Sequence, residues 1–224
     1  MKKAFFLTLI FFLHIYSFPQ SIVTKINEDF LLSYDNGSLV IKNIGFNEEG
    51  STSIPEKNCR VTLKAYDGKV YGPVYGRIDL LTGKFIFTVN GQDLICSVPV
   101  EKIIFDSCYI ALNGALFKNG YPSIYKQNDK IFYQLLSEGK ATLLKYYELK
   151  SRDEMPYNST NTTRIYTQSV KYYLYLNRKV HKIEKNNRNL PKLLAIPAAY
   201  ISNKKKNLKK EQDLIQLVAY FNTQ

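Results

Sequence analysis

The stretch VTLKAYDG, residues 61–68, carries the pattern that decides the fold. Apolar residues alternate with others from Val61 to Ala65, and Asp67-Gly68 follows at once. An alternation with a period of two gives a strand one buried face. Asp-Gly tolerates the positive φ angles that a tight hairpin turn needs. The stretch therefore predicts a strand that ends in a hairpin turn.

The same combination recurs from residue 36 to residue 150. Alternating segments lie at 85–89 and 94–98, and two apolar runs flank Gly139 between residues 131 and 149. The second of these runs fits either a helix or a strand, and its aromatic content favours the strand. Regular short strands predict a mainly β (α+β) protein, an antiparallel meander forming a sandwich or an open barrel. Further turn dipeptides are Asn36-Gly37, Asn90-Gly91, Asn113-Gly114 and Asn119-Gly120.

Beyond residue 150 the pattern changes from strands to helices. Residues 151–163 are polar and predict a surface loop. A strand is expected over 164–176, a turn at Asn177-Arg178 and a returning strand over 180–183. Asn189 and Asn207 are expected to cap helices, and Pro197 to open a helix between them. The last helix has one apolar stripe, formed by Leu214, Leu217, Val218 and Phe221.

The N-terminus has the features of a secretory signal peptide. Lys2 and Lys3 precede an apolar run over residues 4–15, and small and polar residues follow from Ser17 to Ser21. The run is too short to span a bilayer, and no later run is long enough for a transmembrane helix. We therefore expect a signal peptide over 1–20, a β domain over 21–186 and a basic helical tail over 187–224 packed on it. The mature protein would lie in the periplasm, on the outer surface or outside the cell.

Positive charge is unevenly distributed. The formal net charge is +12, and the window 171–210 holds most of it, with Glu184 as its single acid. Such a Lys-rich window can attract anionic envelope components, such as lipid headgroups or acidic polysaccharide. The plainer interpretation, which we favour, is a set of solvated lysines on ordinary helix and hairpin faces.

Cysteines and glycosylation sequons leave alternatives open. Cys59, Cys96 and Cys108 make an odd count without CxxC spacing. Export would permit one disulfide with one thiol left over. We favour three buried free thiols that behave as small hydrophobic residues. The sequons at Asn36, Asn158 and Asn161 are explained by chance in an Asn-rich chain.

No residues can be assigned to catalysis, to a cofactor or to a metal. His181 is the single histidine after the signal, and the neighbouring Lys179 and Lys182 disfavour a bound metal. Carboxylate pairs that could serve a glycosidase are Glu48-Glu49 and Asp153-Glu154, but adjacent carboxylates in polar sequence are usually only solvated. The glycines Gly72, Gly76 and Gly83 do not form a phosphate-binding loop that leads into a helix.

Tyrosines lie beside basic residues on the expected strands. Aromatic platforms with basic flanks can bind single-stranded nucleic acid. The same tyrosines can equally be amphipathic strand residues with solvated hydroxyls. Because the signal peptide makes nucleic acid an improbable partner, we expect no nucleic-acid binding. These residues are Tyr71, Tyr75, Tyr172, Tyr173 and Tyr175.

Three stretches together resemble a group of uncharacterised secreted proteins of Bacteroidetes-type bacteria. They are IFYQLLSEGKATLLKYYEL (131–149), YYLYLNRKVHKIEKNNRNLPKLL (172–194) and LKKEQDLIQLVAYFN (208–222). In that family a strand meander, a YxxLxxGKxxLLK hairpin and a Lys-rich helical end follow one another. The resemblance implies an exported or envelope protein and transfers no active site.

The expected function is therefore broad. We expect an exported envelope or surface protein that acts as a non-enzymatic binding or structural module. The alternative is a carboxylate-based hydrolase that acts on glycans. A deep acidic cleft would favour the hydrolase, and a shallow β face with the basic tail beside it would favour binding.

Overall fold

The computed structural model describes residues 47–89, 91–125, 127–155, 157, 161–184, 188–204 and 207–224. The expected signal peptide, the turn at Asn36-Gly37, Asn90 and the sequon residue Asn158 lie outside these residues. The strands are β1 (Asn47–Glu49), β2 (Ser53–Ala65), β3 (Val70–Asp79), β4 (Lys84–Val89), β5 (Gln92–Ile95), β6 (Val100–Ser107), β7 (Leu116–Lys118), β8 (Tyr133–Ser137), β9 (Ala141–Glu154), β10 (Thr163–Leu176) and β11 (Lys179–Lys182). The helices are α2 (Leu190–Leu193), α3 (Ala198–Asn203) and α4 (Glu211–Thr223).

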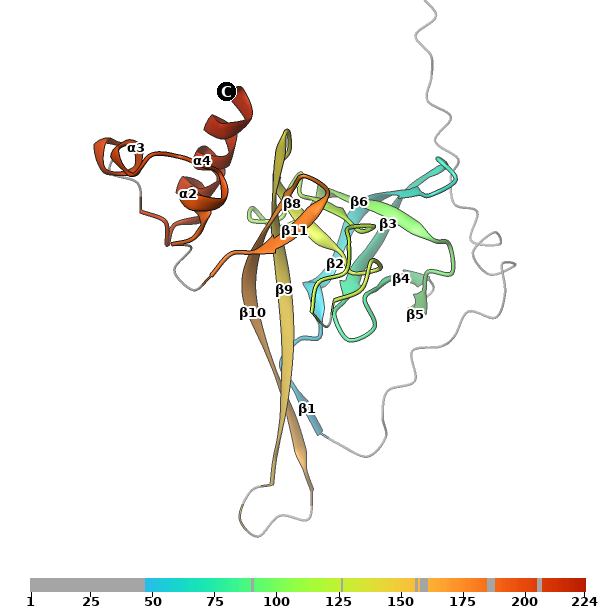
Figure 1. Ribbon diagram of the computed structural model, residues 1–224. Coiled ribbons are helices and arrows are strands. Elements are labelled where there is room, and N and C mark those ends of the chain that lie inside the picture. Colours follow the sequence, from blue (N-terminus) through green and yellow to red (C-terminus); the bar gives the residue numbers. More distant parts are fainter. Residues whose placement is uncertain are drawn as a thin grey trace, which may run out of the picture.

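The described strands form one open, mostly antiparallel sheet of 11 strands (Figure 1). Its order is β1-β10-β9-β8-β7-β6-β2-β3-β4-β5, and β11 pairs with β10 outside this path. Only β1 runs parallel to its neighbour among these pairings. This confirms a mainly β protein with a short C-terminal helical tail. The prediction left a sandwich and an open barrel as alternatives. The structure has a single open sheet that contains every described strand.

Strands β2 to β7, here called the curved sheet, fold around one apolar core. The alternation that begins at Val61 is confirmed, because Val61, Leu63 and Ala65 are buried. Asp67-Gly68 forms the turn between β2 and β3, and Gly68 has a φ of 85°. In β4 the simple alternation fails, since Ile86 is buried along with Phe85 and Phe87. Two-sided burial in β4 hides the period of two.

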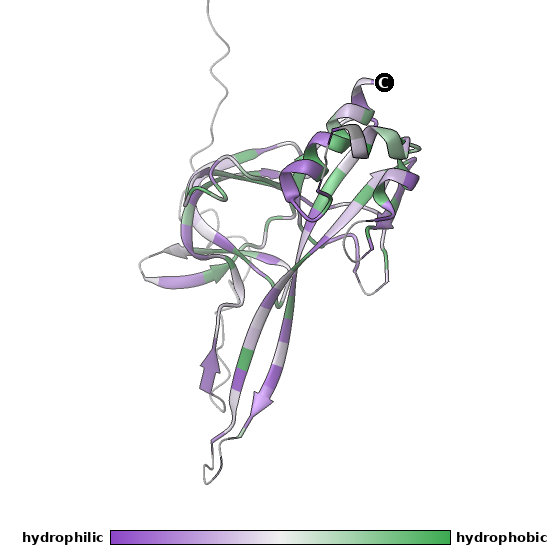
Figure 2. Ribbon diagram, turned by 90° about the vertical axis from the view of Figure 1, so that its left-hand side faces the viewer, coloured by the Kyte–Doolittle hydropathy of each residue, from purple (hydrophilic) through white to green (hydrophobic). Residues whose placement is uncertain are grey.

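Strands β9 and β10, here called the long hairpin, pair along 14 residues each and extend beyond the rest of the molecule (Figures 1 and 2). Gly139 lies in the turn that precedes β9, so the predicted hairpin and the choice of a strand are confirmed. The loop predicted over 151–163 is too long, because β9 continues to Glu154 and β10 begins at Thr163. Cross-strand pairs hold this polar end together. Arg164, for example, donates from Nε and Nη2 to the two carboxylate oxygens of Asp153 (2.7 and 2.8 Å).

The helices cover one face of the hairpin base. The predicted stripe of α4 is buried there, and Leu214, Leu217 and Val218 are 0% exposed. The first residue of α4, Glu211, lies 2.7 Å from the Lys145 ammonium. Near its other end the Asn222 side chain bonds to both the backbone N–H and the carbonyl of Ala141 on β9. Both ends of α4 are thus attached to the sheet.

The helix starts agree in part with the predicted caps. Pro197 is the N-cap residue of α3, as its position predicted. Asn189 is the N-cap residue of α2, as predicted, but its side chain bonds to the backbone of Glu184 and Lys182 and makes no hydrogen bond to the helix. The N-cap residue of α4 is Lys210, because Asn207 instead accepts a hydrogen bond from the Lys209 N–H in a turn before the helix. No helix among the described residues is long and apolar enough to cross a membrane.

The opposite face of the hairpin base is covered by tyrosines. Tyr133 and Tyr173 are buried with ring centroids 5.8 Å apart. Gln127 joins them, since its Oε1 accepts from the Tyr133 hydroxyl and its Nε2 donates to the Tyr173 hydroxyl, both at 2.9 Å. The hairpin base is therefore buried on both faces, by helices on one side and by aromatic rings on the other.

The three cysteines are not all free thiols. Cys59 on β2 and Cys108, just after β6, form a disulfide. Cys96 is free and buried. Our preference for three free thiols is therefore wrong, because antiparallel pairing of β2 with β6 brings two distant cysteines together, with their Cα atoms 5.1 Å apart.

Candidate functional site

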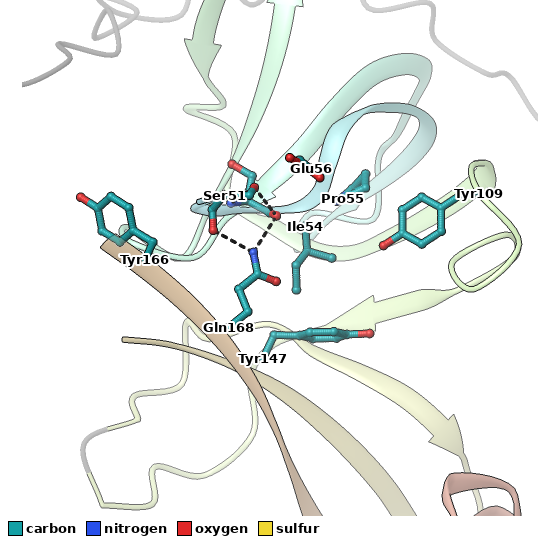
Figure 3. Close-up of a pocket in the computed structure, with 9 residues that line it drawn as sticks. Ser51, Ile54, Pro55, Glu56, Tyr109, Tyr147, Tyr166 and Gln168 are labelled. Atoms are coloured by element: carbon teal, nitrogen blue, oxygen red, sulfur yellow. Dashed lines mark hydrogen bonds between the residues drawn. The ribbon is translucent and has the colours of Figure 1, made fainter. Parts of the chain in front are cut away.

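A pocket of about 330 Å³ lies where the curved sheet meets the long hairpin (Figure 3). We call it the tyrosine pocket. Its walls come from the start of β2, from the turn after β6 and from the middle of β9 and β10. The lining residues are Ser51, Ser53, Ile54, Pro55, Glu56, Tyr109, Tyr147, Tyr166 and Gln168.

The disulfide fixes one wall of this pocket. Tyr109 follows Cys108 directly, and Cys108 is bonded to Cys59 on the strand that also carries Glu56. The turn after β6 also bonds to itself, since the backbone N–H groups of Leu112 and Asn113 donate to the Tyr109 carbonyl. The exposed ring of Tyr109 is therefore held beside β2 by a covalent link and a tight turn, although it lies in a connecting segment.

A clamp fixes the opposite wall. The Gln168 Nε2 donates to the carbonyl oxygens of Ser51 (2.9 Å) and Ser53 (3.2 Å). Gly50 allows the close approach, because its φ is 89° and a Cβ atom there would lie 2.4 Å from the Tyr166 carbonyl oxygen. With its donor held by two carbonyls, the amide of Gln168 has one orientation. Its Oε1 faces the space between Tyr109 and Tyr147 (Figure 3) and accepts no hydrogen bond from a described residue.

Some polar groups of the pocket already have a hydrogen-bond partner among the described residues, and others do not. The Tyr147 hydroxyl donates to Gln134 Oε1 (2.7 Å), and the Tyr166 hydroxyl donates to Glu48 Oε1 (3.2 Å). The Tyr109 hydroxyl has no such partner among the described residues. Partial burial and, next, the negative charge of Glu56 raise the pKa of Tyr109, so this hydroxyl stays protonated at neutral pH and can donate.

The charge of the pocket is negative. Glu56 is the single charged residue among the nine that line it, and no described cation pairs with it. Just outside the lining, the Lys145 ammonium lies 5.3 Å from the centre of the Tyr147 ring. The pocket thus combines aromatic surface with free hydrogen-bonding groups, and it has a carboxylate at one side and an ammonium near another.

A larger groove of about 680 Å³ lies at the end of the curved sheet. Its apolar side includes Phe85, Val98 and the free Cys96, and burial raises the pKa of that thiol to about 11. Two of its polar side chains, Tyr66 and Asn119, are hydrogen-bonded within the protein. The Tyr66 hydroxyl donates to Asn119 Oδ1 (2.7 Å), and Asn119 Nδ2 donates to the Val100 carbonyl (2.9 Å).

Cations of the Lys-rich window gather on β11 and the helical tail. Lys171 is separate, because it lies on β10 and pairs with Glu148. Eight other cations are exposed and form no ion pair with a described acidic residue. This basic set consists of Arg178, Lys179, Lys182, Arg188, Lys192, Lys204, Lys209 and Lys210.

The two carboxylate pairs named from the sequence are brought to the same place, where Asp153 forms an ion pair with Arg164 and Glu154 forms one with Arg152. Arg164 on β10 pairs in register with Glu48 on β1 and with Asp153 on β9. The hydrogen bonds from Arg164 lower the pKa of Asp153. A glycosidase needs a general acid whose pKa is raised. The environment of Asp153 is therefore opposite to what that role requires.

The remaining sequence candidates serve the fold. His181 lies on β11, half-buried beside a pocket of about 490 Å³. No group of three or more His, Cys, Asp or Glu residues in the described part of the chain could hold a metal ion. Gly76 permits close strand packing, since a Cβ atom there would lie 2.3 Å from the Phe85 ring. Most of the tyrosines named from the sequence pack against other residues, and Tyr75 is the exception at 63% exposed.

The residues of the tyrosine pocket were missed from the sequence. Tyr109, Tyr147 and Gln168 come from three separate segments, and no local spacing links them. The one usable signal was Tyr109, which stands next to a cysteine in a segment rich in turn residues. Comparison with protein-family models, with curated proteins and with solved structures finds no match for this chain. The family resemblance therefore rests on the three quoted stretches alone.

Proposed function

We propose that the protein is an exported envelope or surface protein that binds its ligand without catalysis, and that the tyrosine pocket is the ligand site. The observation that carries this proposal is the pocket itself. Its free polar groups belong to side chains that a disulfide and an amide clamp hold in place. Binding sites gain affinity when such groups are ordered before the ligand arrives. Glycoside hydrolysis usually requires two carboxyl groups, and Glu56 is the single carboxylate that lines this pocket.

Two features support export. The N-terminal sequence has the charged, apolar and small-residue regions of a secretory signal. The disulfide between Cys59 and Cys108 suits an oxidising compartment, since such bonds persist outside the cytosol. N-terminal sequencing of the exported protein should find a start between Phe18 and Ile22. Recovery of intact Met1 in the membrane fraction would contradict this part of the proposal.

Binding and hydrolysis can be separated in one experiment. The purified mature protein is mixed with the envelope fraction of the cells that produce it, and the bound fraction and new reducing ends are both measured. We expect sedimentation with the envelope, weaker sedimentation of Tyr109→Ala, and no new reducing ends. The matched control is Tyr75→Ala, which removes a similarly exposed tyrosine outside the pocket. Release of reducing ends by the wild-type protein would favour the hydrolase.

The basic set favours a second contact, with anionic envelope components. Eight exposed cations that form no ion pair with a described acidic residue attract lipid headgroups or acidic polysaccharide over roughly the Debye length, about 10 Å at 0.1 M salt and about 3 Å at 1 M. Binding to vesicles that contain phosphatidylglycerol, or to an acidic polysaccharide, should therefore weaken as salt rises. The two probes distinguish a lipid from a glycan partner.

Charge reversal tests whether the basic set makes this contact. Reversing Lys192, Lys204 and Lys209 to Glu should remove most of the attraction. The control variant reverses Lys57, Arg60 and Lys84, which are exposed on the curved sheet, and so changes the net charge equally. Equal losses in the two variants would show that net charge alone attracts the partner.

A further inference from the structure

We infer that the tyrosine pocket takes an uncharged saccharide, a neutral sugar unit of a larger glycan. This inference rests on the proposed function and adds the chemical class of the ligand. It follows from the kind of groups that line the pocket, from their orientation and from their charge.

The hydrogen-bonding groups suit a polyol. A sugar hydroxyl both donates and accepts, so a sugar site needs acceptors and donors close together. No described residue bonds to Gln168 Oε1, to the Glu56 carboxylate or to the Tyr109 hydroxyl, so the pocket keeps two acceptors and one donor for a ligand. Because the clamp occupies the Gln168 Nε2, the amide cannot turn to offer its nitrogen. The acceptor thus stays aimed at the space that a sugar ring would occupy (Figure 3).

Aromatic surface completes the pattern. The apolar C–H face of a sugar ring packs on aromatic rings, while its hydroxyls reach polar groups at the rim. Tyr109 is 56% exposed and its backbone is held in a tight turn, so its ring is accessible to a ligand and fixed in place. Tyr147 is half-buried and is supported from behind by Phe117, with the two ring centres 6.0 Å apart. These two rings offer a sugar a rigid surface.

Charge disfavours an anionic ligand. A carboxylate or phosphate would meet Glu56, and no cation among the lining residues would compensate. Lys145 lies near the Tyr147 ring but is paired with Glu211 (2.7 Å), so the preference for an uncharged ligand over a cationic one rests on the hydrogen-bonding groups and not on charge. The pocket volume of about 330 Å³ is at the small end for ligand sites, which fits one or two sugar units better than a longer segment.

The chain offers a clean reporter for the test, because it contains no tryptophan. Tyr109→Trp keeps an aromatic ring at the rim and makes it the single tryptophan fluorophore. This variant is titrated with neutral oligosaccharides (malto-, cello- and chito-oligosaccharides) and with anionic ones (oligogalacturonate). We expect a saturable change of tryptophan emission with at least one neutral series, unchanged between 0.1 and 1 M salt, and no response to the anionic series.

Further variants assign the binding to the pocket. In calorimetry with the responding oligosaccharide, Tyr109→Ala should bind about tenfold more weakly than wild type, the scale of one lost aromatic contact and one lost hydrogen bond. Tyr75→Ala should bind like wild type. Glu56→Gln keeps an acceptor but removes the charge, so it should begin to bind the anionic series.

Two outcomes would overturn the inference. One is a response to anionic sugars alone, and the other is no response to any neutral series by a folded Tyr109→Trp protein. Either result leaves the proposed envelope binding intact if the protein still sediments with the envelope. Loss of that sedimentation, or cytosolic retention of the chain, would instead remove the proposed function itself.

Discussion

The curved sheet and the long hairpin hold their strands in different ways. In the curved sheet, each strand pairs with a neighbour close in sequence and buries side chains in a shared core, and a disulfide links β2 to the segment after β6. In the hairpin, β9 and β10 bury most of their side chains at the base, between helices and tyrosines, and toward the far end Tyr166 is the single buried residue of the two described strands. The hairpin base therefore depends on segments up to 81 residues away, such as Asn222 against Ala141. Substitutions in the long-range contacts of the hairpin base and substitutions in the curved sheet should therefore lower the stability by different amounts.

The largest effect is expected where α4 meets the hairpin base. Leu217→Asp should lower the free energy of unfolding by about 4 kcal/mol or more, since it removes a buried leucine and places a charge in an apolar contact. Thermal or urea unfolding measures the change. Ala219→Asp is the control, because it adds the same charge at an exposed position of the same helix. Equal stability of Leu217→Asp and wild type would mean that α4 does not dock in solution.

Loss of the disulfide should have the next largest effect, and it acts on the curved sheet. Replacing both Cys59 and Cys108 by Ser should cost about 2–4 kcal/mol, because the bond closes a loop of 49 residues in the unfolded chain. The same variant should weaken ligand binding, since Tyr109 is no longer held beside β2. Cys96→Ala serves as the control. A double variant with wild-type stability and binding would show that strand pairing alone fixes this wall.

A smaller effect is expected at the clasp between α4 and β9. Asn222 Oδ1 accepts from the Ala141 N–H (2.8 Å), and its Nδ2 donates to the Ala141 carbonyl (2.9 Å), as a neighbouring strand would. Asn222→Ala should therefore cost about 1–2 kcal/mol. Gly139→Ala should also destabilise, because its Cβ atom would lie 2.6 Å from the Asn222 side chain.

The two substitutions at the clasp form a double-mutant cycle. In the Asn222→Ala background, most of the conflict with a side chain at position 139 is gone, so Gly139→Ala should cost less there than in the wild type. Stability of the four proteins is compared by urea unfolding. Purely additive costs would mean that the clasp is not what requires glycine at position 139.

The same contrast explains what could be predicted from the sequence. Turns such as Asp67-Gly68 and Asn177-Arg178 depend on local backbone preferences, and both lie between paired strands. The run after Gly139 was ambiguous between helix and strand because Leu143 and Leu144 are both buried, one against helices and one against tyrosines. When both faces of a strand are buried, apolar and polar residues no longer alternate along it, and the period of two that predicts a strand is lost.

Features that depend on distant pairing could not be read from the sequence. The end of β9 at Glu154 contains no apolar alternation and is held by the ion pair of Asp153 with Arg164 across the hairpin. The cysteine pairing follows from the register of β2 against β6, which no spacing reveals. The pocket wall formed by Tyr109 and Gln168 needs the same long-range arrangement. For this reason the fold class was predicted and the candidate site was not.

The smallest effect concerns acid stability of the hairpin. Lys171 and Ser169 on β10 donate hydrogen bonds to the Glu148 carboxylate on β9, and the bond from Lys171 is the main cause that lowers the pKa of Glu148. As pH falls, the unfolded chain binds this proton first. The stabilisation is therefore complete above the unfolded pKa, about 4.3, and is lost as pH falls through the lower folded pKa. Because the pair is partly exposed, its contribution to stability should be about 0.5 kcal/mol.

Glu148→Gln should thus unfold more easily than wild type at pH 7 by this amount, and the stabilities of the two proteins should converge below the folded pKa, as measured by urea unfolding at each pH. Glu138→Gln, at an exposed turn residue, should follow the wild type at every pH. A difference between Glu148→Gln and wild type that persists unchanged into acid would show that the hydrogen bonds to Glu148 do not depend on its charge.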